Sequence, residues 1–160
     1  MCESAASVTL TRTMRLATFA SLLLTAAACQ STQAPTELGF VSLGRGTQSG
    51  ITTPGVRVAS DSNAWKVLWA EHARLQLPQP PAPQVDFARY RAAIVIAGQR
   101  TSGGYSISVE AVRPRDGKLT VHAFESVPAS GTAQSQALTC PFEIVLVPAG
   151  TEPLELLVRY

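Results

Sequence analysis

Few side chains in this sequence could act as nucleophiles, bases or metal ligands, since it has three cysteines and two histidines. Neither His72 nor His122 lies in a His-x-x-x-His or His-Glu-x-x-His spacing, and no Cys-x-x-Cys pair is present. Those spacings bring metal ligands together on one helix or turn. A zinc site made of both histidines, Cys140 and an acidic residue would form only if the fold brought these distant side chains together. We therefore predict no metal and no cofactor.

Motifs of the common enzyme classes are missing as well. The sequence has no Gly-x-Ser-x-Gly elbow, no phosphate-binding P-loop and no dinucleotide-binding glycine pattern after a predicted strand. Catalysis by Cys140 with a distant histidine is the alternative, but the following Pro141 and the apolar flanks favour a small buried side chain. His122 alternates with apolar neighbours, which puts it on the solvent side of a strand. We predict that the chain is not an enzyme.

Cys29 has a different predicted chemistry, because it ends an export signal. Met14 and Arg15 begin a short basic start, and residues 16–28 form an apolar run of 13 residues, shorter than the roughly 20 needed to span a membrane. The three alanines before Cys29 resemble a lipobox, although Ala26 stands where that motif usually has Leu. In a lipobox the cysteine is acylated and becomes the new N-terminus. The alternative is an ordinary signal peptide cut after Ala-x-Ala; in both cases the protein is exported.

These observations divide the chain into three parts. Residues 1–28 are predicted to be a signal peptide, with Met14 as an alternative start because polar residues precede an already complete signal. Residues 29–36 are predicted to be the lipidated cysteine and a flexible tether of Gln, Ser, Thr, Ala and Pro. One domain at residues 37–160 follows. The predicted location is the bacterial cell envelope, with the chain attached to a membrane through the lipid on Cys29.

The composition of the 160 residues fits one turn-rich domain. Charged residues make up 15%, and the chain has 11 Gly and 11 Pro, a combination that favours short strands joined by turns. The formal net charge is +2 without a basic block, which argues against nucleic-acid binding. Cleavage before Cys29 would remove Cys2 and leave only Cys29 and Cys140. Since acylation would use Cys29, no disulfide is expected.

Apolar spacing predicts one helix and several strands. Asp61 or Ser62 is expected to cap a helix in which apolar residues recur at helical spacing, and four prolines at residues 77–83 must end it. Strands are predicted at residues 38–43, 51–59, 92–97, 105–112, 119–124, 142–147 and 154–158. The third to fifth of these are expected to form an antiparallel meander. The predicted class is α+β, with one main helix packed on an antiparallel sheet of about five to seven short strands.

The two tryptophans of the predicted helix have two interpretations. Trp65 and Trp69 are one helical turn apart, so they either pack into the core or form an exposed aromatic stripe for binding. Because burial of two large rings removes extensive apolar area from water, core packing is predicted.

Several segments in a fixed order resemble the PrcB C-terminal domain family. They are the two tryptophans on the helix, Pro83-Gln84-Val85-Asp86-Phe87, an apolar strand, the loop Gly98-Gln99-Arg100-Thr101-Ser102-Gly103-Gly104-Tyr105, and residues 136–141 before a further strand. The resemblance covers about residues 56–150, and Ser102 stands where the family more often has Gly. The family is named after a lipoprotein subunit of a bacterial surface protease complex, thought to help assemble or stabilise a subtilisin-like protease.

The resemblance implies a protein-binding or stabilising role. Together with the predicted lipid on Cys29, it leads us to expect a lipid-anchored envelope module that binds or stabilises another envelope protein, with a protease as one candidate partner. The alternative is a small-ligand-binding protein or an enzyme that uses the loop at residues 100–105. These hypotheses differ in one structural expectation, because only the second predicts a polar pocket beside that loop.

The same loop is the predicted partner-binding site. Gly103 and Gly104 permit positive φ or a close backbone approach, so one interpretation is a turn whose glycines serve backbone geometry alone. The other is that Arg100 and Thr101 project from the turn and contact a peptide or an anion. Asp86 is expected to accept backbone hydrogen bonds or to pair with an arginine. The candidate partner-binding residues are Asp86, Arg100, Thr101, Ser102, Gly103, Gly104 and Tyr105.

Overall fold

The continuous apolar run at residues 92–97 belongs to a strand that is covered on both faces, which explains why it lacks the alternation of a half-exposed strand. The computed structural model describes residues 37–160; the predicted signal peptide, Cys29 and the tether lie outside the described residues. The strand is β3 (Tyr90–Ile96), and its last five residues are fully buried. It lies inside an antiparallel sheet of order β1-β6-β3-β2, with β1 (Val41–Gly46), β2 (Gly55–Ala59) and β6 (Phe142–Pro148).

A second sheet has the order β4-β5-β7, with β4 (Ser106–Arg115), β5 (Lys118–Ser126) and β7 (Leu154–Arg159). The β4–β5 connection is a two-residue hairpin turn in which Asp116 and Gly117 have φ of 50° and 74°. Positive φ at both central residues is what makes an Asp-Gly pair favourable in such turns. β7 pairs with β5 in the parallel direction.

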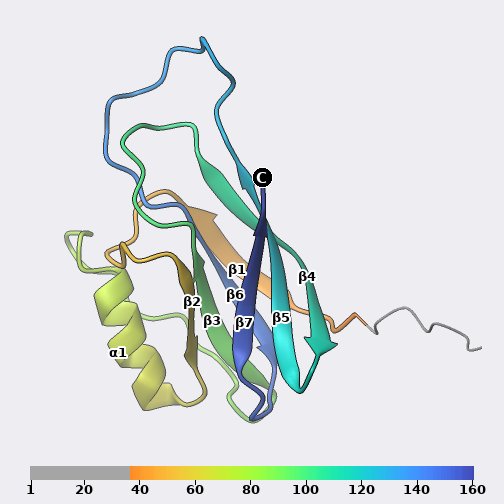
Figure 1. Cartoon of the computed structure of the whole chain (residues 1–160). Coiled ribbons are helices and arrows are strands. Elements are labelled where there is room, and N and C mark those ends of the chain that lie inside the picture. The colour runs from red at the N-terminus through yellow and green to blue at the C-terminus, as the bar shows by residue number, and fades with distance from the viewer. Residues whose placement is uncertain (1–36) are drawn as a thin grey trace, which may run out of the picture. The chain divides into compact units, whose positions relative to one another are not determined.

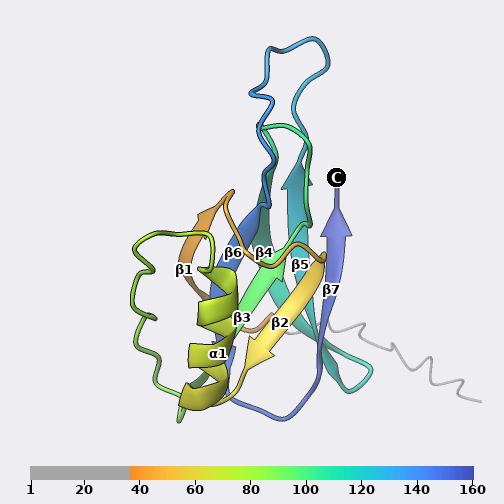
Figure 2. The ribbon, with the colours of Figure 1, turned by 90° about the vertical axis from the view of Figure 1, so that its left-hand side faces the viewer.

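The two sheets stack face to face, and the helix covers the outer side of the four-stranded sheet (Figures 1 and 2). Alternate residues of β3 and β6 therefore enter two different cores. Val95 and Val145 pack between the sheets together with Val121 of β5. Ile94 and Ile144 point the other way and pack beneath the helix. The two inner strands, β3 and β6, are therefore buried on both faces, whereas the outer strands β1 and β2 remain largely exposed.

The helix α1 (Ser62–His72) begins where the sequence predicts. The Asp61 carboxylate accepts hydrogen bonds from the backbone N–H groups of Asn63 and Ala64, at 2.8 and 2.9 Å. An aspartate in this position satisfies N–H groups that have no partner within the helix. Asp61 is therefore the N-cap.

The proline-rich connector after α1 is held against the helix by the two tryptophans. The indole N–H of Trp65 donates to the Pro83 carbonyl at 2.9 Å, and that of Trp69 donates to the Pro80 carbonyl at 2.8 Å. An extended proline-rich segment makes no hydrogen bonds within itself, so its carbonyls need outside donors. Trp65 is only 3% exposed and Trp69 packs against the same core, which confirms the predicted core packing.

A buried carboxylate connects the two sheets. Glu143 on β6 is 2% exposed, and it accepts hydrogen bonds from the Ser42 hydroxyl on β1 at 2.6 Å and from the Val109 N–H on β4 at 2.5 Å. Leu38 adds a single backbone bridge to Val112 of β4. The four-stranded sheet is thus linked to the edge of the three-stranded sheet through side chain and backbone.

Two parts of the predicted architecture are wrong. The strands form two sheets in place of one antiparallel sheet, and β5 and β7 are parallel. The meander fails because β3 and β4 belong to different sheets. Apolar alternation indicates which face of a strand is buried, but it does not indicate which strand lies beside it. Within the described residues, the fold is mostly β, with seven strands and one helix.

Candidate functional site

The pairing of β3 with β6 continues beyond the sheet into two long connections. The Ala97 N–H donates to the Pro141 carbonyl at 2.9 Å, and Arg100 and Thr139 exchange two backbone hydrogen bonds of 2.8 and 3.0 Å. Further out, the Gly103 N–H donates to the Ser135 carbonyl at 2.9 Å. We call residues 97–105 and 127–141 the loop pair. It lies at one end of the stacked sheets, and its second member extends well beyond them (Figures 1 and 2).

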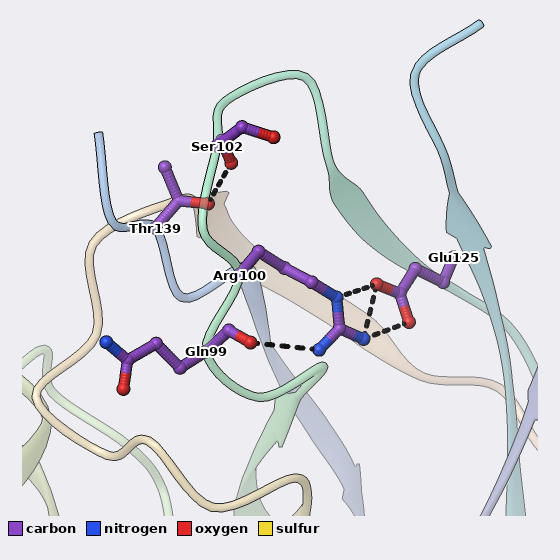
Figure 3. Close-up of polar contacts among 5 residues, drawn as sticks. All are labelled: Gln99, Arg100, Ser102, Glu125 and Thr139. Atoms are coloured by element: carbon purple, nitrogen blue, oxygen red, sulfur yellow. Dashed lines mark hydrogen bonds and ion pairs between the residues drawn. The ribbon is translucent and has the colours of Figure 1, made fainter. Parts of the chain in front are cut away.

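Arg100 fixes the loop pair to the second sheet. Its Nε donates to Oε1 of Glu125 and its Nη2 donates to Oε2, each at 2.8 Å, and Nη2 also lies 2.6 Å from Oε1 (Figure 3). The Glu125 side chain is 2% exposed and that of Arg100 is 25% exposed. Two parallel N–H···O bonds between a guanidinium and a carboxylate set both distance and orientation. The side chain is therefore a structural clamp between the end of β5 and the loop after β3.

The two glycines of the loop provide room for the other member of the pair. A Cβ atom on Gly103 would lie 2.5 Å from the Ser135 hydroxyl, and one on Gly104 would clash with the Gln134 side chain. Gly104 also has φ of +85°, a backbone conformation that is unfavourable for residues with a Cβ atom. Both the close backbone approach and the positive φ expected from the sequence are present. The glycines are needed because a second loop packs on them.

The predicted site residues do not all come together. Asp86 precedes β3 and Arg100 follows it, so a strand of about 20 Å separates them. The Asp86 carboxylate accepts the Ala88 N–H at 3.0 Å and its carbonyl accepts those of Arg89 and Tyr90. It shapes the turn before β3, as one of its two predicted roles requires.

The remaining predicted residues share one loop. Thr101 is exposed, Ser102 and Tyr105 are half-buried, and the Ser102 carbonyl accepts the Thr139 hydroxyl at 2.9 Å (Figure 3). The Arg100 guanidinium carbon lies 5.6 Å from the centre of the Tyr105 ring. Arg100 is thus occupied inside the molecule, whereas Thr101 is free to contact a partner. A binding role for these residues stays a prediction.

Four residues of this site were not predicted: Glu125, Gln134, Ser135 and Thr139. Glu125 could have been found, because it continues the inward-facing series of β5 that contains Val121 and Ala123. An acid at an inward position requires a cation or several hydrogen bonds. The residues of the second loop carry no comparable signal, since uncharged polar residues are common in ordinary loops.

The reactive side chains considered in the sequence lie elsewhere or are buried. Cys140 is 5% exposed, its thiol lies 2.9 Å from the Ile51 carbonyl, and burial raises its pKa against the opposing effect of the Arg100 charge. Its predicted burial is confirmed. His122 is half-exposed on β5, and no cluster of three metal-binding side chains occurs among residues 37–160. Likewise, no helix in this part of the chain is long and apolar enough to cross a membrane.

We expect His72 to make the stability of the fold pH-dependent. It is 1% exposed, lies 3.0 Å from the Ser49 hydroxyl, and its pKa is lowered from 6.5 by burial. The unfolded chain therefore binds a proton at higher pH than the folded chain, and stability falls as the pH drops below 6.5. The slope contributed by this histidine is at most about 1.4 kcal/mol per pH unit. Urea unfolding at several pH values between 7.5 and 5.5 measures how the free energy of unfolding changes with pH. Wild type and the control His122→Gln should lose stability at this rate as the pH falls, whereas His72→Gln should not. The same pH dependence in His72→Gln as in wild type would contradict the prediction.

Comparison with known protein families finds a match to part of the chain. Residues 92–148 match the family model described as PrcB C-terminal. The chain thus contains a segment similar to the PrcB C-terminal family. The matched PrcB-like segment begins in β3, contains both members of the loop pair and ends at β6, while the helix and the proline-rich connector precede it. The family is associated with a protease complex and is not itself a catalytic family. Neither the curated proteins nor the solved structures include a significant match to this chain.

Proposed function

We propose that the chain is a lipid-anchored envelope module that binds or stabilises another envelope protein, with a protease as the leading candidate partner. The family match supports a protein-binding role associated with a protease complex. The observation that carries the proposal is the loop pair. It is held by the Arg100–Glu125 clamp and by glycine-dependent packing, yet residues such as Thr101 and Gln136 remain exposed on it.

A rigid, exposed loop pair is suited to binding a protein. A loop that is already ordered loses less conformational entropy when it binds, so more of the contact energy appears as affinity. The alternative of a small-ligand site or an enzyme requires a polar pocket beside residues 100–105. One hollow, of about 540 Å³, is lined by residues of the β4-β5-β7 sheet, among them His122, Arg113 and Arg159, and by none of residues 100–105.

The protein-binding role can be tested by placing charges on the loop pair without disturbing its contacts. In a Thr101→Glu, Gln136→Glu variant both changed positions are exposed, so the fold should persist while partner binding weakens by about tenfold or more. Capture of envelope proteins on the immobilised domain, followed by mass spectrometry, measures this. The matched control is Thr151→Glu, which adds charge to the exposed connection between β6 and β7. Equal recovery of every protein by the loop variant and the control would refute binding through the loop pair.

The lipid anchor rests on the sequence around Cys29 and has its own test. Replacement Cys29→Ser removes the thiol that acylation needs, so labelling by a fatty-acid analogue should be lost and the domain should move from the membrane to the soluble fraction. The buried Cys140 serves as the control, because Cys140→Ser should leave labelling intact. Labelling of Cys29→Ser at the wild-type level would disprove the anchor.

A further inference from the structure

In the part of the chain that the structure describes, the two sheets have four edge strands, and three of them carry features that hinder pairing with a further strand. On β1 the register shifts between Ser42 and Gly44, and a bulge of this kind disrupts a regular edge. β2 has only five residues with Arg57 at its centre, so two copies paired about that residue would oppose like charges. The edge of β4 is covered by the Glu143 carboxylate, which accepts the Val109 N–H. The fourth edge strand, β7, has none of these three features.

The β7 strand lies at the margin of the three-stranded sheet (Figure 2). Within the described part of the chain it pairs with β5 alone, and this ladder is regular over all six residues. Since the Leu119 N–H donates to the Pro153 carbonyl, the odd-numbered residues of β7 turn their backbone groups toward β5. The N–H and C=O groups that face the free edge are therefore those of Leu154, Leu156 and Val158. An unpaired edge of this kind is a template for another strand.

The outward-facing side chains of β7 are complementary to those of a second copy of the same strand. Glu155, Leu157 and Arg159 are exposed, and the residues between them are half-buried. In an antiparallel pair centred on Leu157, Glu155 of each copy lies opposite Arg159 of the other, and opposite charges in this position stabilise the pair. The same register places Leu156 opposite Val158, which are two of the residues whose backbone groups face the free edge. The order of charges and the free backbone groups thus agree on one register.

Both charged side chains have a partner within the molecule, but they remain open to solvent. Glu155 lies 3.1 Å from Lys118, and Arg159 lies 2.6 Å from Glu110. The side chains of Glu155 and Arg159 are nevertheless 57% and 65% exposed. A carboxylate can accept several hydrogen bonds and a guanidinium can donate several. A second copy can therefore add contacts to these side chains without breaking the existing ion pairs.

We infer that β7 is a dimerisation strand, which pairs in the antiparallel direction with β7 of a second copy of this chain, centred on Leu157. The pairing joins the two three-stranded sheets into one continuous sheet. Each copy contributes the same surface, and a contact of that kind closes at two copies. Backbone hydrogen bonds along the edge provide affinity, and the contacts between Glu155 and Arg159 select the register. β7 contributes no residue to the loop pair, so the inference does not depend on the proposed function.

Cross-linking of introduced cysteines tests the pairing and its register. In extracts of cells that express the full chain, Leu157→Cys should form a disulfide-linked dimer when oxidised with copper phenanthroline. Leu157 bonds β5 through its backbone, so the central pair is not hydrogen-bonded and its Cα atoms should lie about 4.5 Å apart. Glu155→Cys is the register control, since its two copies would lie about 14 Å apart. Val67→Cys, at a position 72% exposed on α1, is the control for chance collisions. We expect at least about tenfold more dimer from Leu157→Cys than from either control.

Charge reversal tests the complementarity in the same extracts. Glu155→Arg, combined with Leu157→Cys, places like charges opposite each other, so the yield of dimer should fall about fivefold or more. Addition of Arg159→Glu brings opposite charges together again and should return the yield to within about twofold of Leu157→Cys alone. A yield from Leu157→Cys no higher than from the two controls would overturn the inference. An unchanged yield in the Glu155→Arg variant, or no recovery on addition of Arg159→Glu, would overturn it as well.

Discussion

Replacing Arg100 with Ala should lower the free energy of unfolding by about 3–5 kcal/mol, the range seen when one partner of a buried ion pair is removed. The substitution leaves the Glu125 carboxylate, 2% exposed, without its two guanidinium hydrogen bonds. Because Arg100 itself is 25% exposed, water can reach part of the vacated space, and the lower end of that range is expected. Urea unfolding followed by tryptophan fluorescence measures the change.

Two further variants show whether the buried charge causes this loss. In an Arg100→Ala, Glu125→Gln double variant no buried charge remains, so a substantial part of the stability should return relative to Arg100→Ala. The control pair is Arg113 and Glu37, which lie 3.5 Å apart with side chains 38% and 52% exposed. Arg113→Ala should cost less than about 1 kcal/mol, since water already screens that pair. If Arg100→Ala costs no more than Arg113→Ala, the clamp contributes nothing to the fold.

Local features of the fold follow from the sequence because short-range physics determines them. The Asp61 cap, the Asp116-Gly117 turn and the doubly buried β3 strand each depend on residues that are close together in the chain. The division into two sheets depends on which distant strands pair. β3 pairs with β6, about fifty residues later, and not with β4, and no local pattern in either strand indicates that choice.

The candidate site shows the same limit. Gly103 and Gly104 are recognisable in the sequence as positions of unusual backbone geometry, but the reason for them lies in Gln134 and Ser135, some thirty residues later. In one of the two interpretations of this loop Arg100 projects toward a partner, whereas its guanidinium is bound to Glu125. The sequence thus indicates one loop of the site, while the packing of the second loop on it is visible only in the fold.

Replacing Trp65 with Ala should be the other strongly destabilising change, with a loss of about 3–5 kcal/mol. The ring is 3% exposed and packs in the core beneath α1, with its centroid 5.5 Å from that of Trp69. Truncation removes the buried ring area and also leaves the Pro83 carbonyl without the indole donor. The substitution therefore weakens both the helix-to-sheet contact and the attachment of the proline-rich connector. Guanidinium unfolding followed by far-ultraviolet circular dichroism avoids reliance on tryptophan emission.

A phenylalanine variant separates the contribution of the buried ring from that of the indole hydrogen bond. Trp65→Phe keeps most of the apolar contact but has no N–H donor, so it should cost about 1 kcal/mol from the hydrogen bond and a further amount from the smaller ring. The surface control is Val67→Ala, two residues along the same helix and 72% exposed, for which a change within about 0.5 kcal/mol is expected. A Trp65→Ala loss as small as that of Val67→Ala would mean that the tryptophan is not part of the core. The exposed aromatic stripe considered from the sequence would then be the better interpretation.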